Sequence, residues 1–231
     1  MILEMTRPVQ GGLRQERKLE GVSNNLANVD TVGYKKDVIS FDREFKAALT
    51  KDFAQGDFRQ TGNAFDLALT GEGFFKIDTP DGIQYTRNGN FNLSREGILV
   101  DNNGNPVLGQ AGAIAFDLAN DPGTGPEINE DGEIRLNGDL IDTLDIVTFA
   151  DVGKLEKTGK NLMEYTGPTT DELVAEGVQV HQRVLESSNV QAVEEMVKMI
   201  DYHRMFETFT KSMLTFDEVD AKIIGEVGKV S

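Results

Sequence analysis

One stretch of this chain resembles the start of a calcium-binding loop. It reads "DNNGN" from Asp101 onward, so that one Asp and two Asn residues alternate as the first ligands of such a loop do. The loop also needs a glycine at its sixth position and a glutamate at its twelfth, where this chain has Pro106 and Gly112. We therefore interpret the stretch as a β-turn and expect no metal site there.

The other patterns give no support to an enzyme. "GEGFFK" at 71–76 has a Gly-x-Gly pair, but the third glycine and the helix of a nucleotide-binding loop are missing, which favours a turn before a strand. His181 and His203 have no second ligand at zinc-site spacing and no serine nucleophile motif nearby, and the chain has no Cys. We expect no catalytic, cofactor-binding or metal-binding residues.

Composition limits the partners. The chain has 231 residues, enough for one or two domains, and a formal net charge of −16. Nucleic acid is not an expected partner, because binding it requires a surplus of Lys and Arg. No apolar run approaches the roughly 18 residues of a membrane span, so we expect no membrane insertion. The N-terminal residues lack the apolar stretch of a cleaved signal peptide.

The chain divides into three regions that differ in the spacing of their apolar residues and in their turn signals. Residues 1–28 have apolar residues at helical spacing, but Pro8 and Gly11-Gly12 weaken the first turns, so the spacing predicts a helix from Leu13 to Ala27. Residues 55–165 contain short strand-like runs separated by turn signals, typical of an antiparallel β domain. The predicted strands are "FDLALTG", "GFFKID", "IQYTR", "FNLS", "GILVD", "AIAFDL", "EIRLNG" and "LDIVTFA", and the predicted hairpin turns are Asp81-Gly82, Asn88-Gly89 and Asp131-Gly132.

The third region, from Ser188 to Val227, is predicted to be one long helix with a heptad-like seam. The seam residues are Met199, Tyr202, Phe206, Phe209, Met213, Phe216, Asp220 and Ile223. Such a helix needs a partner to bury its apolar face, and the N-terminal helix is the simplest one. Because that helix is shorter, part of the apolar face stays uncovered, which indicates a contact with another subunit.

The stretch "SNNLANVDTVGYKK" at 23–36 follows the first helix. Asn and Ser favour helix ends and turns, and Gly33 can adopt the left-handed conformation. Two interpretations stay open: a turn within the subunit, or an interface loop that sets the angles between subunits.

Four stretches of the chain resemble the bacterial flagellar rod and hook proteins, in the same order along the sequence. They are "SNNLANVDTVGYKKD", "QGDFRQTGNAFDLALTGEGFF", "YTRNGNFNLSREGILVDNNGNPVLG" and "VLESSNVQAVEEMVKMIDYHRMFETFTKSMLTFDEV". The resemblance is strongest to the rod proteins, since the chain is short and has one compact β region. It implies a structural subunit of the flagellar basal-body rod, most similar to the proximal type. The alternatives are a distal-rod or hook-like axial protein, or a β-type binding module with dimerising helices.

The resemblance also implies how the subunit works. Members of the family pass through the flagellar export apparatus without a cleaved signal peptide. They assemble with copies of themselves and neighbouring rod proteins into a hollow helical tube in the periplasm, which transmits torque. Their terminal helices form the inner layer, and the β domain the outer one. No cofactor is implied.

The residues expected at or near subunit contacts lie in the Asn-rich stretch, at the entry to the β domain and in the C-terminal helix. They are Asn24, Asn25, Leu26, Asn28, Thr31, Gly33, Tyr34, Thr61, Gly62, Asn63, Asp66, Phe74, Ser188, Asn189, Val190, Glu195, Met196, Met199, Ile200, Arg204 and Phe206.

The expected fold class is α+β, with an antiparallel β domain inserted between N- and C-terminal helices that pair as a coiled-coil-like stalk. The expected division is 1–45 for the helix and Asn-rich loop, 46–175 for the β domain, and 176–231 for the long C-terminal helix.

Overall fold

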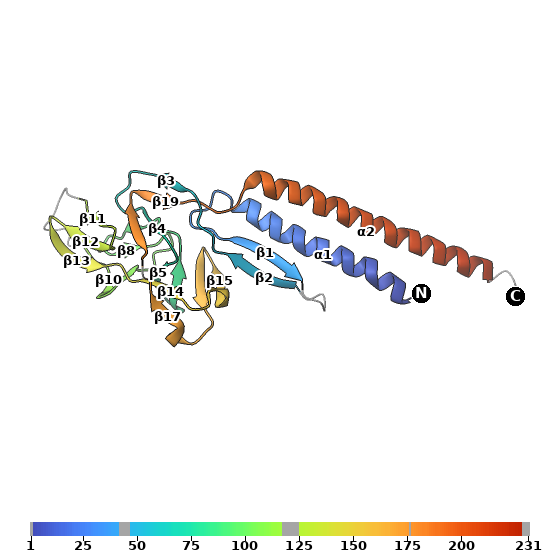
Figure 1. The fold of residues 1–231 in the computed structure, drawn as a ribbon, viewed down its shortest axis with the longest axis horizontal. Coiled ribbons are helices and arrows are strands. Elements are labelled where there is room, and N and C mark those ends of the chain that lie inside the picture. The colour runs from blue at the N-terminus through green and yellow to red at the C-terminus, as the bar shows by residue number, and fades with distance from the viewer. Residues whose placement is uncertain (1, 42–46, 117–124, 176, 228–231) are drawn as a thin grey trace. The chain divides into compact units, whose positions relative to one another are not determined.

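A computed structural model describes residues 2–41, 47–116, 125–175 and 177–227 (Figure 1). The chain forms two compact units. The first, called the helical unit below, comprises Met1–Val29, Lys36–Asp52 and Val190–Ser231. The second, the β unit, comprises Asp30–Lys35 and Phe53–Asn189. Two helices and many antiparallel strands confirm the α+β class.

Helix α1 spans Ile2–Ala27, so it begins well before the predicted start at Leu13, and this part of the prediction is wrong. Packing explains the difference. A Cβ atom on Gly11 would lie 2.5 Å from the ring of Phe209, so this helix comes very close to α2 at its glycine pair. Burial against another helix stabilises a helix more than residue propensity does, and here it outweighs Pro8 and the glycines.

Helix α2 spans Ala192–Val227 and lies beside α1 within the helical unit (Figure 1). Its hydroxyl residues suit a helix interior because each donates to a carbonyl one turn earlier, as Thr208 does to Arg204 at 2.9 Å and Thr210 to Phe206 at 3.0 Å. The predicted seam residues from Met199 to Met213 are partly buried, whereas Phe216 is exposed.

A hairpin of β1 (Lys36–Phe41) and β2 (Ala47–Asp52) completes the helical unit, and the sequence did not predict it. Ile39 packs against Gly21 of α1, where a Cβ atom would lie 2.6 Å from its Cδ1. The hairpin was not predicted because its strands, "KDVISF" and "AALTKD", lack a clear alternation of apolar and polar residues. In the structure, Val38 and Leu49 are exposed.

The β unit holds the remaining strands, most of them short. They are β3 (Phe58–Gln60), β4 (Leu67–Thr70), β5 (Phe74–Thr79), β6 (Gly82–Thr86), β7 (Asn92–Leu93), β8 (Leu99–Val100), β9 (Leu108–Gly109), β10 (Gly112–Ala113), β11 (Glu127–Ile128), β12 (Glu133–Leu136), β13 (Asp139–Thr143), β14 (Ile146–Phe149), β15 (Leu155–Gly159), β16 (Leu162–Tyr165), β17 (Glu172–Val174), β18 (Gln179–Gln182) and β19 (Val184–Glu186), with 3-10 turns at Val152–Lys154 and Thr169–Asp171.

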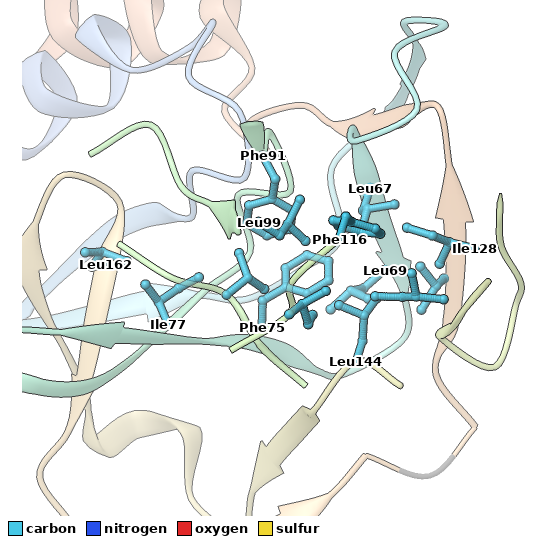
Figure 2. Close-up of a cluster of buried hydrophobic side chains, with 14 residues drawn as sticks. Leu67, Leu69, Phe75, Ile77, Phe91, Leu99, Phe116, Ile128, Leu144 and Leu162 are labelled. Atoms are coloured by element: carbon cyan, nitrogen blue, oxygen red, sulfur yellow. The ribbon is translucent and has the colours of Figure 1, made fainter. Parts of the chain in front are cut away.

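The main sheet has six strands in the order β15-β16-β6-β5-β14-β17, and both of its faces are covered. Alternation along β5 sends Phe75 and Ile77 into one apolar cluster, shown in Figure 2, and Phe74 into a second one. In the first cluster the Phe75 and Phe91 rings meet edge to face at 5.1 Å. The predicted strand "GFFKID" is therefore confirmed as β5, with Phe74 and Phe75 buried on opposite faces of the sheet.

Two of the three predicted hairpin turns are confirmed. Asp81-Gly82 joins β5 to β6, and Asp131-Gly132 joins β11 to β12. The prediction for Asn88-Gly89 is wrong, because β6 pairs with β5 and β16 rather than with the strand that follows. Gly89 instead lies against β4, and its carbonyl accepts the Leu67 N–H at 2.9 Å. Local turn chemistry could not reveal this long-range contact.

The predicted strand "AIAFDL" is confirmed only in part within the described residues. Only β10 and an isolated bridge between Ile98 and Ala115 fall in its described part, and residues 117 and 118 lie outside the described residues. The side chains of Ile114 and Phe116 still enter the first apolar cluster. The backbone of this segment also pairs with its neighbours, since the Ile114 N–H donates to the Val107 carbonyl at 3.2 Å and the Phe116 N–H to the Gly97 carbonyl at 2.7 Å.

Candidate functional site

Asn25, near the end of α1, joins three elements of the helical unit. Only 2% of this residue is exposed. Its Nδ2 donates to the Asp37 carbonyl at 2.9 Å, and its Oδ1 accepts from the Asp37 N–H at 2.8 Å. Nδ2 also lies 3.3 Å from Oε2 of Glu195 in α2. Only a carboxamide places a donor and an acceptor side by side in this way, so the chemistry of the site requires Asn or Gln.

Asn24 and Asn28 close the end of the same helix. Asn24 Nδ2 donates to the Asp37 carboxylate at 2.7 Å, and Asn28 Nδ2 donates to the Asn24 carbonyl at 2.8 Å. The last carbonyls of a helix have no partner within it, so the Asn28 side chain acts as a C-terminal cap. The Asn-rich stretch thus forms contacts inside one subunit. Leu26 is half-buried beside it.

Each of the two buried carboxylates of the helical unit has a cation. Asp37 forms an ion pair with Lys51, and Glu195 lies 2.9 Å from the Nζ atom of Lys198. Lys198 also binds Glu194 at 2.8 Å, and this hydrogen bond raises the pKa of Lys198 and lowers the pKa of Glu194. Pairing compensates for the loss of hydration that burial of these charges imposes.

In the β unit, Gly33 and Tyr34 belong to a tightly packed turn. Gly33 has φ of +67°, and a Cβ atom on it would lie 2.5 Å from the Arg87 carbonyl carbon. Its N–H donates to the Glu186 carbonyl at 2.8 Å. The Tyr34 N–H donates to Thr31, and the Tyr34 ring lies 3.9 Å from the Lys157 ammonium. Glycine is therefore required at position 33 both for its conformation and for space.

A buried cluster of three charged residues lies next to this turn. Lys35 Nζ is 2.7 Å from Glu186 Oε1, and Arg87 Nε is 3.2 Å from Glu186 Oε2. Burial lowers the pKa of the Arg87 guanidinium, while Glu186 acts in the opposite direction. Lys35 also donates to the Ala54 carbonyl at 2.8 Å, and Arg87 donates to Gly71 at 2.8 Å. The cluster therefore joins five segments that are distant in the sequence.

The predicted interface residues at the entry to the β unit differ in exposure. Thr61, Gly62 and Asn63 are exposed, and the Thr61 N–H donates to the Arg183 carbonyl at 2.9 Å. Asp66 is buried and accepts from the Asn90 side chain at 2.7 Å. These contacts hold the 61–66 loop on the strand pair β4–β18. Phe74 is buried in the second apolar cluster.

The segment before α2 is similarly tied down. Asn189 Nδ2 donates to the Ala54 carbonyl at 3.1 Å, and the backbone of Ser188 lies against Gly56, where a Cβ atom would be 3.2 Å away. In the helical unit, Val190 is buried. Along α2, Met196, Ile200 and Arg204 are exposed, whereas Met199 and Phe206 are half-buried.

Three family models match the chain. The model of the flagella basal body rod protein matches residues 11–35, that of the flagellar hook protein FlgE/F/G D1 domain matches 68–136, and that of the flagellar basal body rod FlgEFG protein C-terminal region matches 181–226. The flagellar basal-body rod protein FlgF of Caulobacter vibrioides is 34% identical over 93% of this chain and 94% of its own length. This chain belongs to the flagellar basal-body rod protein family.

Two further relatives support the same family. The rod protein FlgF of Mesorhizobium japonicum is 32% identical over 83% of this chain, and the rod protein FlgG of Bacillus subtilis is 29% identical over 97% of it. As a rod protein of the proximal type, this chain is a structural subunit of the basal body and not an enzyme. The matches do not favour the alternative of a distal-rod, hook-like or binding-module protein.

The enzyme-like patterns have structural explanations in this rod protein. The Asp101 carboxylate accepts the N–H groups of Asn103 at 2.7 Å and Asn105 at 2.9 Å, so it forms a turn. Within the part of the chain that the structure describes, no group of three or more His, Asp or Glu residues could hold a metal ion. None of the helices described there is long and apolar enough to cross a membrane. His181 bonds Thr70 at 2.9 Å, and the His203 side chain is exposed.

The charged partners of the motif residues were not predicted from the sequence. Asp37, Lys35, Arg87 and Glu186 are the charged residues that these two networks share with the motif residues, yet none was among the predicted residues. Lys35 and Asp37 stand within the quoted "GYKKD", so proximity to the Asn-rich stretch was an available signal for them. Nothing in the sequence distinguishes Glu186 from the other acidic residues.

Proposed function

We propose that this rod subunit polymerises with copies of itself and with neighbouring axial proteins into a hollow helical tube that transmits torque. The exposed apolar side chains of α2 carry the proposal. Val193 is 76% exposed, and Met196, Val197 and Ile200 are each about half exposed. These residues stay uncovered although α2 already packs on α1 in the same subunit. A contiguous apolar surface of this kind indicates a contact with another protein.

In this proposal α1 and α2 pair as a coiled-coil-like stalk that forms the inner layer of the tube. The spacing of the partly buried residues in α2, and the close approach of Phe209 to Gly11, support such pairing. In the division into 1–45, 46–175 and 176–231, the first and third parts would build the inner layer and the second the outer one. The compact units differ from this division at three places, since residues 47–52 belong to the helical unit and residues 30–35 and 177–189 to the β unit.

The predicted interface residues would act in two ways. Exposed ones, such as Thr61, Met196, Ile200 and Arg204, are available for direct contact with another subunit. Buried ones, such as Asn25, would act indirectly, because they hold α1, β1 and α2 in the arrangement that presents the contact surface. A filament needs two different patches that meet head to tail, so residues of both groups would be required.

Export and location complete the proposal. The subunit would reach the periplasm through the flagellar export apparatus, without a cleaved signal peptide, and assemble there. The formal net charge of −16 supports a function without nucleic acid.

The test is deletion of the gene, followed by electron microscopy of purified basal bodies. We expect rods that stop short and carry no hook, and recovery when the full-length gene is returned. A gene that encodes a chain ending at Tyr202, which lacks most of α2, should not restore the rod. Complete basal bodies and normal swimming in the deletion strain would contradict the proposal.

A further inference from the structure

A cavity of about 220 Å³ lies among α1, β1 and the first turns of α2, within the helical unit. Apolar side chains and five charged ones line it, and the charged residues are Lys18, Lys36, Lys198, Asp37 and Glu195. Three lysines against two carboxylates leave a positive surplus in a chain whose formal net charge is −16. The lining side chains themselves thus carry one more positive than negative charge.

Four of these charges have partners of opposite sign. Asp37 binds Lys51, Glu195 binds Lys198 at 2.9 Å, and Lys36 lies 3.6 Å from the Asp52 carboxylate. Lys198 also binds Glu194, which does not line the cavity, at 2.8 Å, so Lys18 is the lining cation for which the described residues supply no carboxylate.

Lys18 lies between two aromatic rings. Its Nζ atom is 5.1 Å from the centre of the Tyr202 ring and 6.0 Å from that of Phe41. Among the residues that the structure describes, no carboxylate forms an ion pair with it. Arg17, the preceding residue, differs, because it pairs with Glu20 at 2.9 Å on the helix surface. Cation–π contacts hold the Lys18 ammonium in place. Its N–H groups can still donate a charge-assisted hydrogen bond to an acidic group from outside the subunit.

We infer that this cavity binds a carboxylate side chain of a second copy of this chain. The inference rests on the proposed self-assembly and names one of its contacts. The volume exceeds the roughly 30 Å³ share of a water molecule several-fold, which is enough for the end of an acidic side chain. Other copies are rich in such groups, with 39 Asp and Glu residues against 23 Lys and Arg. A carboxylate beside Lys18 would form a charge-assisted hydrogen bond with its ammonium group.

The first test places Lys18→Glu in the deletion strain, with Arg17→Glu as the matched control. Both changes reverse one charge on neighbouring positions of α1, but only Lys18 lines the cavity. We expect Lys18→Glu to reduce hooked basal bodies by about tenfold or more, because like charges facing each other across an interface are strongly unfavourable. Arg17→Glu should assemble normally. Lys18→Met, which keeps the apolar stem, should also weaken assembly while the purified variant unfolds at the same denaturant concentration as the original protein.

The second test identifies the partner. Revertants of Lys18→Glu that swim are selected, and changes of an Asp or Glu to Lys in the same gene are collected. Such a change is then tested in trans, on a second gene copy that retains Lys18. Two copies that fail singly should build rods together, because each cavity then meets an opposite charge on the other copy.

Two results would overturn the inference. One is normal assembly of both Lys18→Glu and Lys18→Met. The other is restoration only in cis, or only by changes at Asp37 or Glu195, which would assign Lys18 to contacts inside its own subunit. The deletion strain without any added gene is scored in parallel. If it still stops at a short rod, the proposed function stands even when the cavity inference fails.

Discussion

The side chain of Asn25 and the backbone of Asp37 bond to each other as two opposed residues of an antiparallel sheet do. Two hydrogen bonds of 2.8 and 2.9 Å link them, one in each direction. The side chain of a helical residue thus supplies hydrogen-bond partners for the backbone of β1 at its second residue, Asp37. This contact explains why an Asn is needed at the end of α1, and it lies inside one subunit.

We predict that Asn25→Ala destabilises the helical unit by about 2–4 kcal/mol, because it leaves buried backbone groups of Asp37 and the Glu195 carboxylate without this partner. Asn28→Ala removes only an exposed cap and should cost about 0.5–1 kcal/mol. Urea unfolding followed by the helical circular dichroism signal measures both. Equal costs for the two variants would contradict the assignment of Asn25 to an internal contact.

The second prediction concerns Gly33, whose φ is +67° and whose Cα lies against the backbone of Arg87. Gly33→Ala should destabilise the β unit by about 3 kcal/mol, through left-handed strain and a clash that backbone atoms cannot relieve. Gly62→Ala is the control, because φ is +83° there too but nothing lies within 4 Å of an added Cβ. Gly62→Ala should lower the free energy of unfolding by only roughly 1 kcal/mol, the cost of placing Ala in the left-handed conformation. The difference between the two free energies of unfolding measures the clash alone.

The elements with strong periodicity could be predicted from the sequence. The apolar spacing of α2 and the strand-length run "GFFKID" of β5 are local patterns, and the structure contains both elements. The β1–β2 hairpin could not be predicted in this way, because its stability comes from packing on α1 through Ile39. The hairpin turn predicted at Asn88-Gly89 was wrong for a related reason, because this segment is bonded to β4, which is distant in the sequence.

The candidate site was only partly predictable. The Asn residues were found because their type and spacing are unusual, but the partner of Asn25 could not be read from the sequence. Glu195 is distant along the chain, and 39 acidic residues offer no means of choosing it. Which polar residues become buried depends on the fold, and local patterns do not contain that information.

The third prediction concerns the buried cluster of Lys35, Arg87 and Glu186. Glu186→Gln should destabilise the β unit by about 3–5 kcal/mol, because it leaves two buried cations without their carboxylate. Glu133→Gln is the control, since Glu133 pairs with Arg135 on the surface at 2.9 Å. Its effect should stay below about 1 kcal/mol. Thermal and urea unfolding of both variants would test this, and a near-zero effect of Glu186→Gln would show that the buried charges contribute no net stability.

The fourth prediction is a loss of stability in alkali. Burial and the hydrogen bond to Glu172 raise the pKa of Tyr85 above its ordinary value. Burial alone would lower the pKa of Lys76, but its hydrogen bonds to Glu172 and Asp145 raise it. Both groups hold their protons more tightly in the folded state. Their contribution to stability is therefore complete below about pH 10 and is lost as the pH rises beyond it.

Tyr85→Phe tests this assignment. The variant should lose about 1 kcal/mol at neutral pH, because one hydrogen bond to Glu172 is gone. Above about pH 10 its free energy of unfolding should fall less steeply with pH than that of the original protein. Parallel slopes for the two proteins would mean that another group causes the alkaline loss.

The last prediction uses the neighbouring glycines of α1, which face α2 differently. A Cβ atom on Gly11 would lie 2.5 Å from the Phe209 ring, whereas on Gly12 the nearest atoms, of Met213 and Phe209, are 3.9 Å away. Gly11→Ala should therefore cost about 1–3 kcal/mol, while Gly12→Ala should stabilise the protein by about 0.5–1 kcal/mol through helix propensity. Combining Gly11→Ala with Phe209→Leu should recover part of the loss, because the smaller side chain leaves room for the methyl group. Additive costs in the double variant would mean that the two residues do not touch, and that α1 and α2 pack in another register.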